Sequence, residues 1–198
     1  LLATPGPRHA GVRAETNASV SKTDPLHFLP IGLALMGGEQ LGAAEVLAAM
    51  KFLRRNLRHD PRARATELME ALSLEPLQEG DNVTPAPGFG SCFGGVDSFA
   101  CAAAARLHRS FPQNEALAWG IAFVAGLESA NAGWRMTGLA AAMFADLGFT
   151  PNVGAGLFQL ASSPGLLAHG IELTGKPLTD MPFVSDSHYH HEQAESND

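Results

Sequence analysis

The sequence predicts an all-α protein. Apolar side chains recur every three or four residues over long stretches, as they do on the buried face of an amphipathic helix. No stretch shows the alternating Val, Ile and Thr pattern of a half-buried strand, and no motif repeats at a fixed period. Hydrophobic residues make up 45% of the 198 residues, which is enough to build a sizeable core.

Two helices are expected in the first half of the chain. Over residues 43–57 the apolar side chains fall at spacings that form one stripe, and over residues 64–72 they do so more briefly. The stretch 80–87 contains a glycine and two prolines, and it breaks the pattern. We therefore expect the second helix to be followed by a loop.

Four more helices are expected in the second half. Residues 99–111 and 115–127 form two alanine-rich segments, and Pro112 marks the boundary between them because proline cannot continue a helix. Residues 137–147 and 153–173 follow, separated by a glycine and a proline. The many small alanine side chains indicate that these helices pack closely.

Composition and charge exclude several classes of protein. The net charge is -7 and the 13 lysine and arginine residues are dispersed apart from one short run, so no basic face for nucleic acid is expected. That run is Lys51, Arg54, Arg55 and Arg58, which we interpret as the solvated end of a helix. No stretch of about 18 apolar residues predicts a membrane span, and no signal peptide is visible, although the chain starts at Leu1 rather than at methionine.

The two cysteines, Cys92 and Cys101, lie on an apolar, alanine-rich segment. We interpret them as small buried thiols in a reducing compartment rather than as a disulfide. A cytoplasmic protein is therefore expected. The alternative for Cys92, which follows Ser91, is a role as a nucleophile.

Histidines at two places are candidates for a functional role. The tail contains His188, His190 and His191, which suggest a metal site because imidazole is a usual zinc ligand. Three histidines at a polar terminus are more typical of a flexible, solvated tail, so no metal is expected. His169 lies on an apolar helix, and we interpret it as a hydrogen-bonded packing residue rather than a general base.

One short motif, Pro87-Gly88-Phe89-Gly90-Ser91, is typical of a ligand-binding loop. Glycine on both sides of an aromatic residue lets the backbone turn tightly and come close to a ligand, so such a loop can wrap part of a coenzyme. A structural turn that ends a linker has the same pattern. Other segments of the chain are needed to distinguish a ligand-binding loop from a structural turn.

Three further segments bear on that decision. Residues 37–46 contain a Gly-Gly turn that opens a helix. Residues 136–139 read Met-Thr-Gly-Leu and are followed by a Leu-Gly turn within residues 146–149. Residues 157–172 have the pattern of a long C-terminal helix.

In order and approximate spacing, these segments and the loop at 87–91 resemble the active-site motifs of the citrate synthase and citryl-CoA lyase family. The resemblance extends from about residue 10 to 185 and is closest to the citryl-CoA lyase branch, including the citrate-synthase-like module of ATP-citrate lyase. It implies an all-α, citrate synthase-like fold, with a large helical domain from residues 1–42 and 149–198 and a small helical domain from residues 43–148. It also implies a dimer paired through the large domains, and a cleft between the domains for a CoA ester.

The residues that match the family's catalytic positions are substituted. Leu41 and Ser91 stand where the family has histidines, and Thr137 stands where it has an aspartate. In the family a carboxylate takes the proton from the acyl α carbon while a neutral histidine donates to the developing enolate. Leucine can do neither, threonine holds its proton too tightly to be a base near neutral pH, and serine can only donate a hydrogen bond.

The substrate side is changed as well. Phe99 and Ser162 occupy the positions of two family arginines, whose guanidinium groups suit the capture of a tricarboxylate. The basic run at 51–58 is an alternative contact for a CoA phosphate. The substrate-binding set that the resemblance implies is Gly88, Phe89, Gly90, Asp97, Phe99, Ser162 and His169.

These substitutions lead to three hypotheses. The first is a non-catalytic or divergent paralogue that binds a CoA thioester and pairs with itself or with an active relative. The second is an active citryl-CoA lyase or citrate synthase-type enzyme that makes or breaks a carbon–carbon bond on an acyl-CoA, with Ser91, Cys92, Asp97 or His169 in new roles. The third is a plain CoA-ester sensor or structural protein. The expected small-molecule partner is an acyl-CoA or a citrate-like molecule, with no other cofactor and no nucleic acid or membrane.

Overall fold

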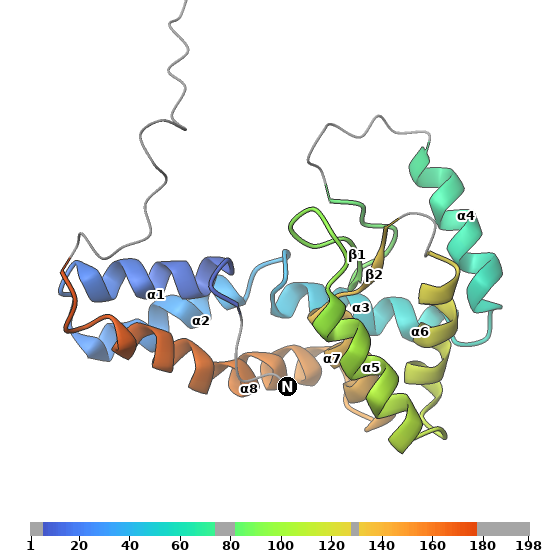
Figure 1. Cartoon of the computed structure of the whole chain (residues 1–198). Helices are drawn as coiled ribbons and strands as arrows, with labels where there is room; N and C mark the ends of the chain where they lie inside the picture. Colours follow the sequence, from blue (N-terminus) through green and yellow to red (C-terminus); the bar gives the residue numbers. More distant parts are fainter. Residues whose placement is uncertain (1–5, 74–81, 128–130, 178–198) are drawn as a thin grey trace, which may run out of the picture.

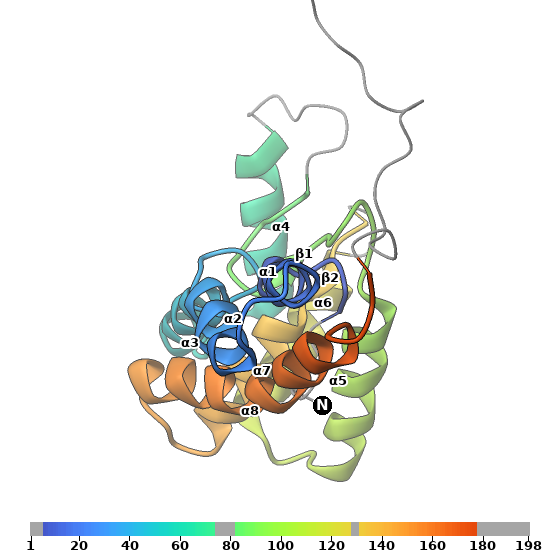
Figure 2. The ribbon, with the colours of Figure 1, turned by 90° about the vertical axis from the view of Figure 1, so that its left-hand side faces the viewer.

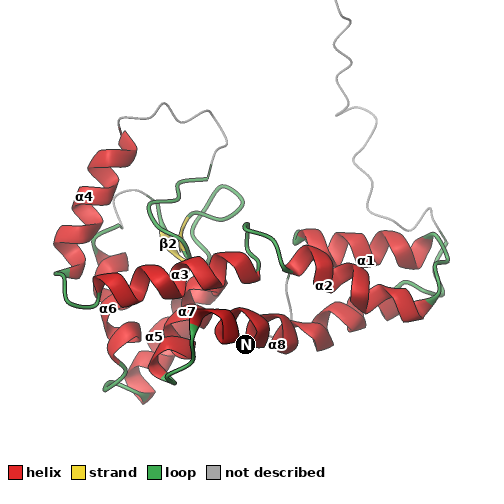
Figure 3. Cartoon of the chain, turned by 180° about the vertical axis from the view of Figure 1, so that it is seen from behind, coloured by secondary structure: helices red, strands yellow, loops and turns green. Residues whose placement is uncertain are grey.

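The structure is a computed structural model that describes residues 6–73, 82–127 and 131–177. These residues form eight α-helices, one 3-10 helix and one pair of two-residue strands (Figures 1 and 3). In chain order the elements are α1 (Ala10–Val20), η1 (Pro25–His27), α2 (Phe28–Met36), α3 (Ala43–Asn56), α4 (Pro61–Ser73), β1 (Phe89–Gly90), α5 (Ser98–Ser110), α6 (Glu115–Ala125), β2 (Gly133–Trp134), α7 (Met136–Asp146) and α8 (Pro151–Glu172).

The all-α prediction is confirmed, and the six helices expected from periodicity and breakers are all present. The largest difference is at the start of α4, which begins at Pro61. Proline is tolerated in the first turn of a helix, and the Asp60 carboxylate accepts a hydrogen bond from the N–H of Ala63 at 2.7 Å, so the helix starts earlier than its apolar stripe.

The expectation of no strands needs one correction. β1 and β2 pair antiparallel, with Phe89 opposite Trp134 and Gly90 opposite Gly133. Two residues per strand are too few to show an alternating pattern in the sequence, so this pair is invisible to periodicity. It nevertheless places the loop at 87–91 against the start of α7.

The long helix α8 joins two groups of helices (Figure 1). Its first half packs on α3 and α7, where a Cβ at Gly154 would overlap the Met50 side chain. Its second half packs on α1 and α2, where a Cβ at Gly170 would lie 2.9 Å from the Phe28 ring; Figure 2 views this group end-on. The assignment of residues 43–148 to a small domain stays a prediction.

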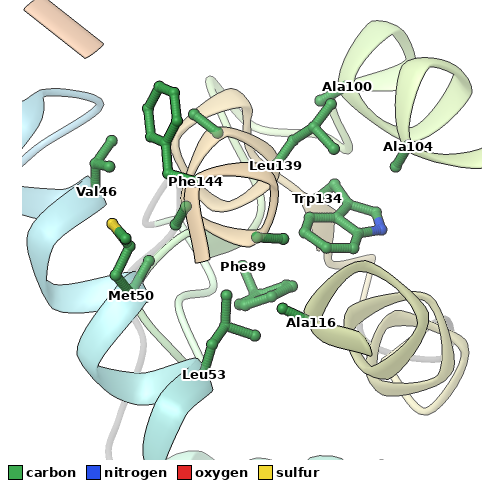
Figure 4. Close-up of a cluster of buried hydrophobic side chains, with 14 of the residues drawn as sticks. Val46, Met50, Leu53, Phe89, Ala100, Ala104, Ala116, Trp134, Leu139 and Phe144 are labelled. Atoms are coloured by element: carbon green, nitrogen blue, oxygen red, sulfur yellow. The ribbon is translucent and has the colours of Figure 1, made fainter. Parts of the chain in front are cut away.

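The hydrophobic core of the larger helix group is centred on aromatic side chains. The fully buried ring of Phe89 lies 4.8 Å from the ring of Trp134 and 5.0 Å from that of Phe123, measured between centroids. Met50 and Leu53 of α3 close the cluster from the opposite side (Figure 4). The loop at 87–91 is therefore anchored by its own aromatic residue.

Three further expectations can be set against the structure. None of the described helices is both long and apolar enough to cross a membrane. Cys92 and Cys101 are free thiols that are half-buried, whereas full burial was expected, because the loop carrying Cys92 and the first turn of α5 lie at the surface. The histidine-rich stretch 188–191 lies outside the described residues.

Candidate functional site

A cavity of about 410 Å³ gathers six of the residues singled out from the sequence. The residues that line it are Leu41, Cys92, Asp97, Phe99, Thr137 and Ser162. The walls come from the segment before α1, the end of α2, the turn before α3, the loop at 92–96, the starts of α5 and α7, and the middle of α8. A cavity of this size between packed helices is typical of a small-molecule site.

Ser91 lies behind the cavity wall. It is 3% exposed, and its hydroxyl oxygen accepts a hydrogen bond from the N–H of Val83 at 2.7 Å. Its neighbour Cys92 lines the cavity instead. Burial raises the pKa of the Cys92 thiol, which makes it a poorer nucleophile near neutral pH.

The loop glycines support the wall and do not line it. Gly88 has φ +80°, and it lies so close to Gly138 of α7 that neither residue has room for a Cβ. Gly90 and the core residue Phe89 are likewise buried away from the cavity. His169 lies on α8 outside the cavity, with Nδ1 3.7 Å from the carboxylate of Glu172. Direct ligand contacts of these predicted residues stay predictions.

Leu41 is held in an unusual backbone conformation at the cavity. Its φ of +58° is in the left-handed region that non-glycine residues rarely adopt. Its N–H donates to Glu45 Oε2 at 2.8 Å, and its carbonyl accepts from His9 Nε2 at 3.2 Å. These two contacts fix the strained turn and with it the position of an apolar side chain in the cavity wall.

His9 is a cavity residue that the sequence analysis missed. It is 7% exposed, and its Nδ1 accepts a hydrogen bond from the N–H of Gly11 at 3.0 Å. The ring proton is therefore on Nε2, which donates to Leu41. Burial lowers the pKa of His9, with a smaller opposing effect from the bond to the Leu41 carbonyl. The imidazole is thus neutral near pH 7, with both nitrogens engaged.

A buried ion pair stands behind the cavity. Arg135 Nη1 donates to Glu45 Oε1 at 2.9 Å, and both side chains are less than a tenth exposed. Glu45 also accepts from the N–H of Gly88, and Arg135 also donates to the carbonyl of Ser91. The pair therefore ties together the turn before α3, the loop at 87–91 and the start of α7.

Two helices begin at the cavity with different N-terminal caps. The Asp97 carboxylate caps α5 by accepting from the N–H of Ala100 at 3.0 Å. At α7 the capping position is Arg135, whose side chain makes no capping hydrogen bond. Thr137, in the first turn of α7, is 1% exposed, and its hydroxyl has no hydrogen-bond partner among the described residues.

Arg8 supplies positive charge at the cavity. Its guanidinium carbon lies 4.2 Å from the centre of the Phe93 ring, which is close enough for a cation–π contact. No ion pair with a carboxylate involves Arg8 within the described part of the chain. Asp97 is the one acidic residue in the described lining.

The basic run at residues 51–58 lies elsewhere, at a second hollow of about 630 Å³ between α3 and α4. Lys51 and Arg55 line this hollow together with His59 and Arg64. Arg54 instead donates to the carbonyl of Phe149 at 2.9 Å. A contact of this run with a CoA phosphate stays a prediction. Within residues 6–73, 82–127 and 131–177, no cluster of three or more His, Cys, Asp or Glu side chains is placed to hold a metal ion.

Comparison with solved structures identifies the architecture. Citryl-CoA lyase from Hydrogenobacter thermophilus matches with a TM-score of 0.66 and 17% identity, over 98% of this chain and 73% of that one. Citrate synthase from Thermotoga maritima MSB8 matches with a TM-score of 0.70 and 17% identity, over 100% of this chain and 54% of that one. The chain has the citrate synthase fold. The resemblance noted in the motifs is therefore confirmed at the level of the fold.

A third citrate synthase fold structure extends this comparison. The citrate synthase of Thermoplasma acidophilum, solved in a ternary complex with carboxymethyl coenzyme A and oxaloacetate, matches with a TM-score of 0.63 and 18% identity, over 88% of this chain and 46% of that one. The chain spans about half the length of the two citrate synthases. No protein-family model and no curated protein matches the sequence.

Proposed function

We propose that this citrate synthase-fold protein binds a CoA thioester, with the acyl group in the cavity, and does not perform carbon–carbon bond chemistry. The observation that carries the proposal is the cavity itself. It remains open to a small molecule, while Leu41 and Thr137 in its walls cannot exchange a proton with a substrate near neutral pH.

The other titratable groups around the cavity support a binding role. Both nitrogens of His9 are engaged in hydrogen bonds, and the Asp97 carboxylate caps α5. The Cys92 thiol has a raised pKa. Removal of a proton from an acyl α carbon needs a base with a free lone pair at that carbon. His9 has no free lone pair and the Cys92 thiol is protonated near neutral pH, which leaves Asp97 Oδ2 as the one unengaged carboxylate oxygen in the described lining.

An active enzyme with altered residues is the alternative function. Its support is that Cys92 and Asp97 lie in the wall of the same cavity. In that case the isolated protein would turn over an acyl-CoA, and Asp97→Ala would abolish the turnover. Asp97 would then take the proton on Oδ2, because Oδ1 accepts the capping hydrogen bond of α5.

We also propose a cytoplasmic dimer, formed with a second copy or with an active relative. The outer face of α8 carries Val153, Leu160 and Ile171 with exposures of 48%, 67% and 52%, and burial of such residues favours association. Light scattering of the purified chain, alone and mixed with an active relative, tests the assembly. A monomer in both samples contradicts it.

The decisive experiment is calorimetric titration with CoA, acetyl-CoA and citrate, together with a citryl-CoA cleavage assay on the same sample. Phe99→Ala should weaken binding about three- to ten-fold, because Phe99 lines the cavity at the start of α5. Phe111→Ala, at the other end of α5 and also exposed, is the matched control and should leave binding unchanged. Binding without cleavage supports the proposal, cleavage supports the alternative, and no binding contradicts both.

A further inference from the structure

The start of α7 at the cavity wall lacks a cap. Met136 and Thr137, its first two residues, both line the cavity. The first N–H groups of a helix have no partner within the helix and carry partial positive charge. Neither a capping bond from Arg135 nor an acidic residue in the first turn compensates for this at α7. At the same cavity, the Asp97 carboxylate caps a corresponding N–H group of α5.

The Thr137 hydroxyl is a second, independent unsatisfied group at this place. It is buried, and it has no hydrogen-bond partner among the described residues. Buried polar groups in native proteins are nearly always paired, and each exception needs an explanation such as a missing ligand. A hydroxyl beside free helix N–H groups is suited to an acceptor oxygen with negative charge.

The remaining surroundings indicate an anionic group on an apolar chain. Arg8 adds a positive charge that pairs with no carboxylate among the described residues. Met36, Leu41 and Phe158 make the neighbouring wall apolar. The cavity therefore combines an apolar surface with donors concentrated at one helix end.

We propose that the acyl group bound in this cavity carries a carboxylate of its own, which accepts hydrogen bonds from the Thr137 hydroxyl and the first N–H groups of α7. The ligand then supplies at α7 the cap that Asp97 supplies at α5. The ligand class is a dicarboxylic acyl thioester such as malonyl-CoA, and no bond is made or broken. This inference rests on the proposed function, because it names the acyl group of the same ligand.

Two ligands that differ only in this group test the proposal. Malonyl-CoA and isovaleryl-CoA have nearly the same shape, but the second carries methyl groups in place of the carboxylate oxygens. We expect malonyl-CoA to bind at least about ten-fold more tightly in calorimetry, as a hydrogen-bonded charged group does. Thr137→Val should remove most of that preference, and Thr137→Ser should retain it. Thr137→Asp should reverse it by charge repulsion.

Stability measurements distinguish ligand binding by the Thr137 hydroxyl from a role of that hydroxyl in holding the fold. Thr137→Val preserves the side-chain volume and removes an unpaired buried hydroxyl, so its melting temperature should be equal to or higher than that of the wild type. Thr66→Val, on the exposed face of α4, is the control and should leave both affinities unchanged.

Each failure has a distinct meaning. Equal wild-type affinity for malonyl-CoA and isovaleryl-CoA overturns the inference and leaves the proposed function standing. If no CoA ester binds, the proposed function fails, and free malonate is then titrated against uncharged malonamide. If malonate does not bind more tightly than malonamide, or if Thr137→Val leaves that preference unchanged, the inference is overturned as well.

Discussion

Arg135 and Glu45 are the residues on which the geometry behind the cavity depends. Their charges are buried, and each stays compensated only while the other is present. The same two side chains hold the N–H groups of Leu41 and Gly88 and the carbonyl of Ser91. Loss of either partner therefore leaves both an unpaired charge and released backbone groups.

We expect Arg135→Met to lower the free energy of unfolding by about 3–5 kcal/mol, because it leaves the Glu45 carboxylate buried and unpaired. The double variant with Glu45→Leu should recover part of this loss, since no charge then remains. Urea unfolding measures both. The more exposed pair Arg64–Glu67, whose side chains are 28% and 67% exposed, provides the control, and Arg64→Met should cost less than about 1 kcal/mol. Equal costs in the two arginine variants would contradict the prediction.

Which site residues could be predicted depended on whether they lie in a motif. Leu41, Thr137 and Ser162 were found because they occupy motif positions, and the structure places them around one cavity. Arg8 and His9 were missed because no pattern marks the segment before α1. The bond of His9 to Leu41 joins residues 32 positions apart, and such a contact exists only after folding.

Among the elements, α1 carries the least expected buried group. Glu15 is fully buried, and neither carboxylate oxygen has a partner among the described residues. The side chain faces α2, where a Cβ at Gly32 would overlap it. Burial raises the pKa of Glu15 to about 7. The packing of α1 on α2 is therefore sensitive to pH.

The direction of this sensitivity follows from the two protonation equilibria. In the unfolded chain a glutamate has a pKa of about 4.3, whereas the pKa of Glu15 in the folded protein is about 7. Between these two values the folded state binds the proton and the unfolded state does not, so the protein loses stability as the pH rises from about 4.3 to about 7. Above about pH 7 there is little further change. Glu15→Gln removes this loss. Its gain in unfolding free energy should be about 2 kcal/mol larger at pH 8 than at pH 5 in urea titrations. Glu39→Gln, an exposed control, should show no such difference.

The contact between α7 and the loop at 87–91 leads to another prediction. A Cβ at Gly138 would overlap the backbone of Gly88, so Gly138→Ala should cost about 1–3 kcal/mol of stability through overpacking. Gly156 lies on α8 with nothing within 4 Å of its Cβ position. Gly156→Ala should therefore stabilise the protein by about 0.5–1 kcal/mol. Thermal unfolding of both variants checks the pair, and a shift of the same sign in both would contradict it.

Helices with a regular apolar stripe were predictable, and those without one were not. α3 and α5 to α8 have stripes or clear breakers, so their ends could be placed. α1 buries Glu15 and Ser19 on the face toward its neighbours, and polar residues on a buried face hide the period. The strands β1 and β2 depend on a contact between distant segments and leave no local signal.

At the scale of the whole molecule, α8 couples the two helix groups. It contacts α3 and α7 in one group and α1 and α2 in the other. Because each half of α8 packs on a different group, unfolding of one group exposes apolar surface on that half of the helix. The two groups should therefore unfold together.

Phe28 offers a direct test of this coupling. It is fully buried in α2 against Gly170 of α8, while both tryptophans, Trp119 and Trp134, lie in the other group. Phe28→Ala should cost about 3–5 kcal/mol. With joint unfolding of the two groups, the tryptophan fluorescence transition in urea should shift together with the far-UV circular dichroism transition. Leu26→Ala, a nearby control that is 81% exposed, should shift neither transition. A fluorescence midpoint that stays at the wild-type value while the dichroism midpoint falls would show that α1 and α2 unfold on their own.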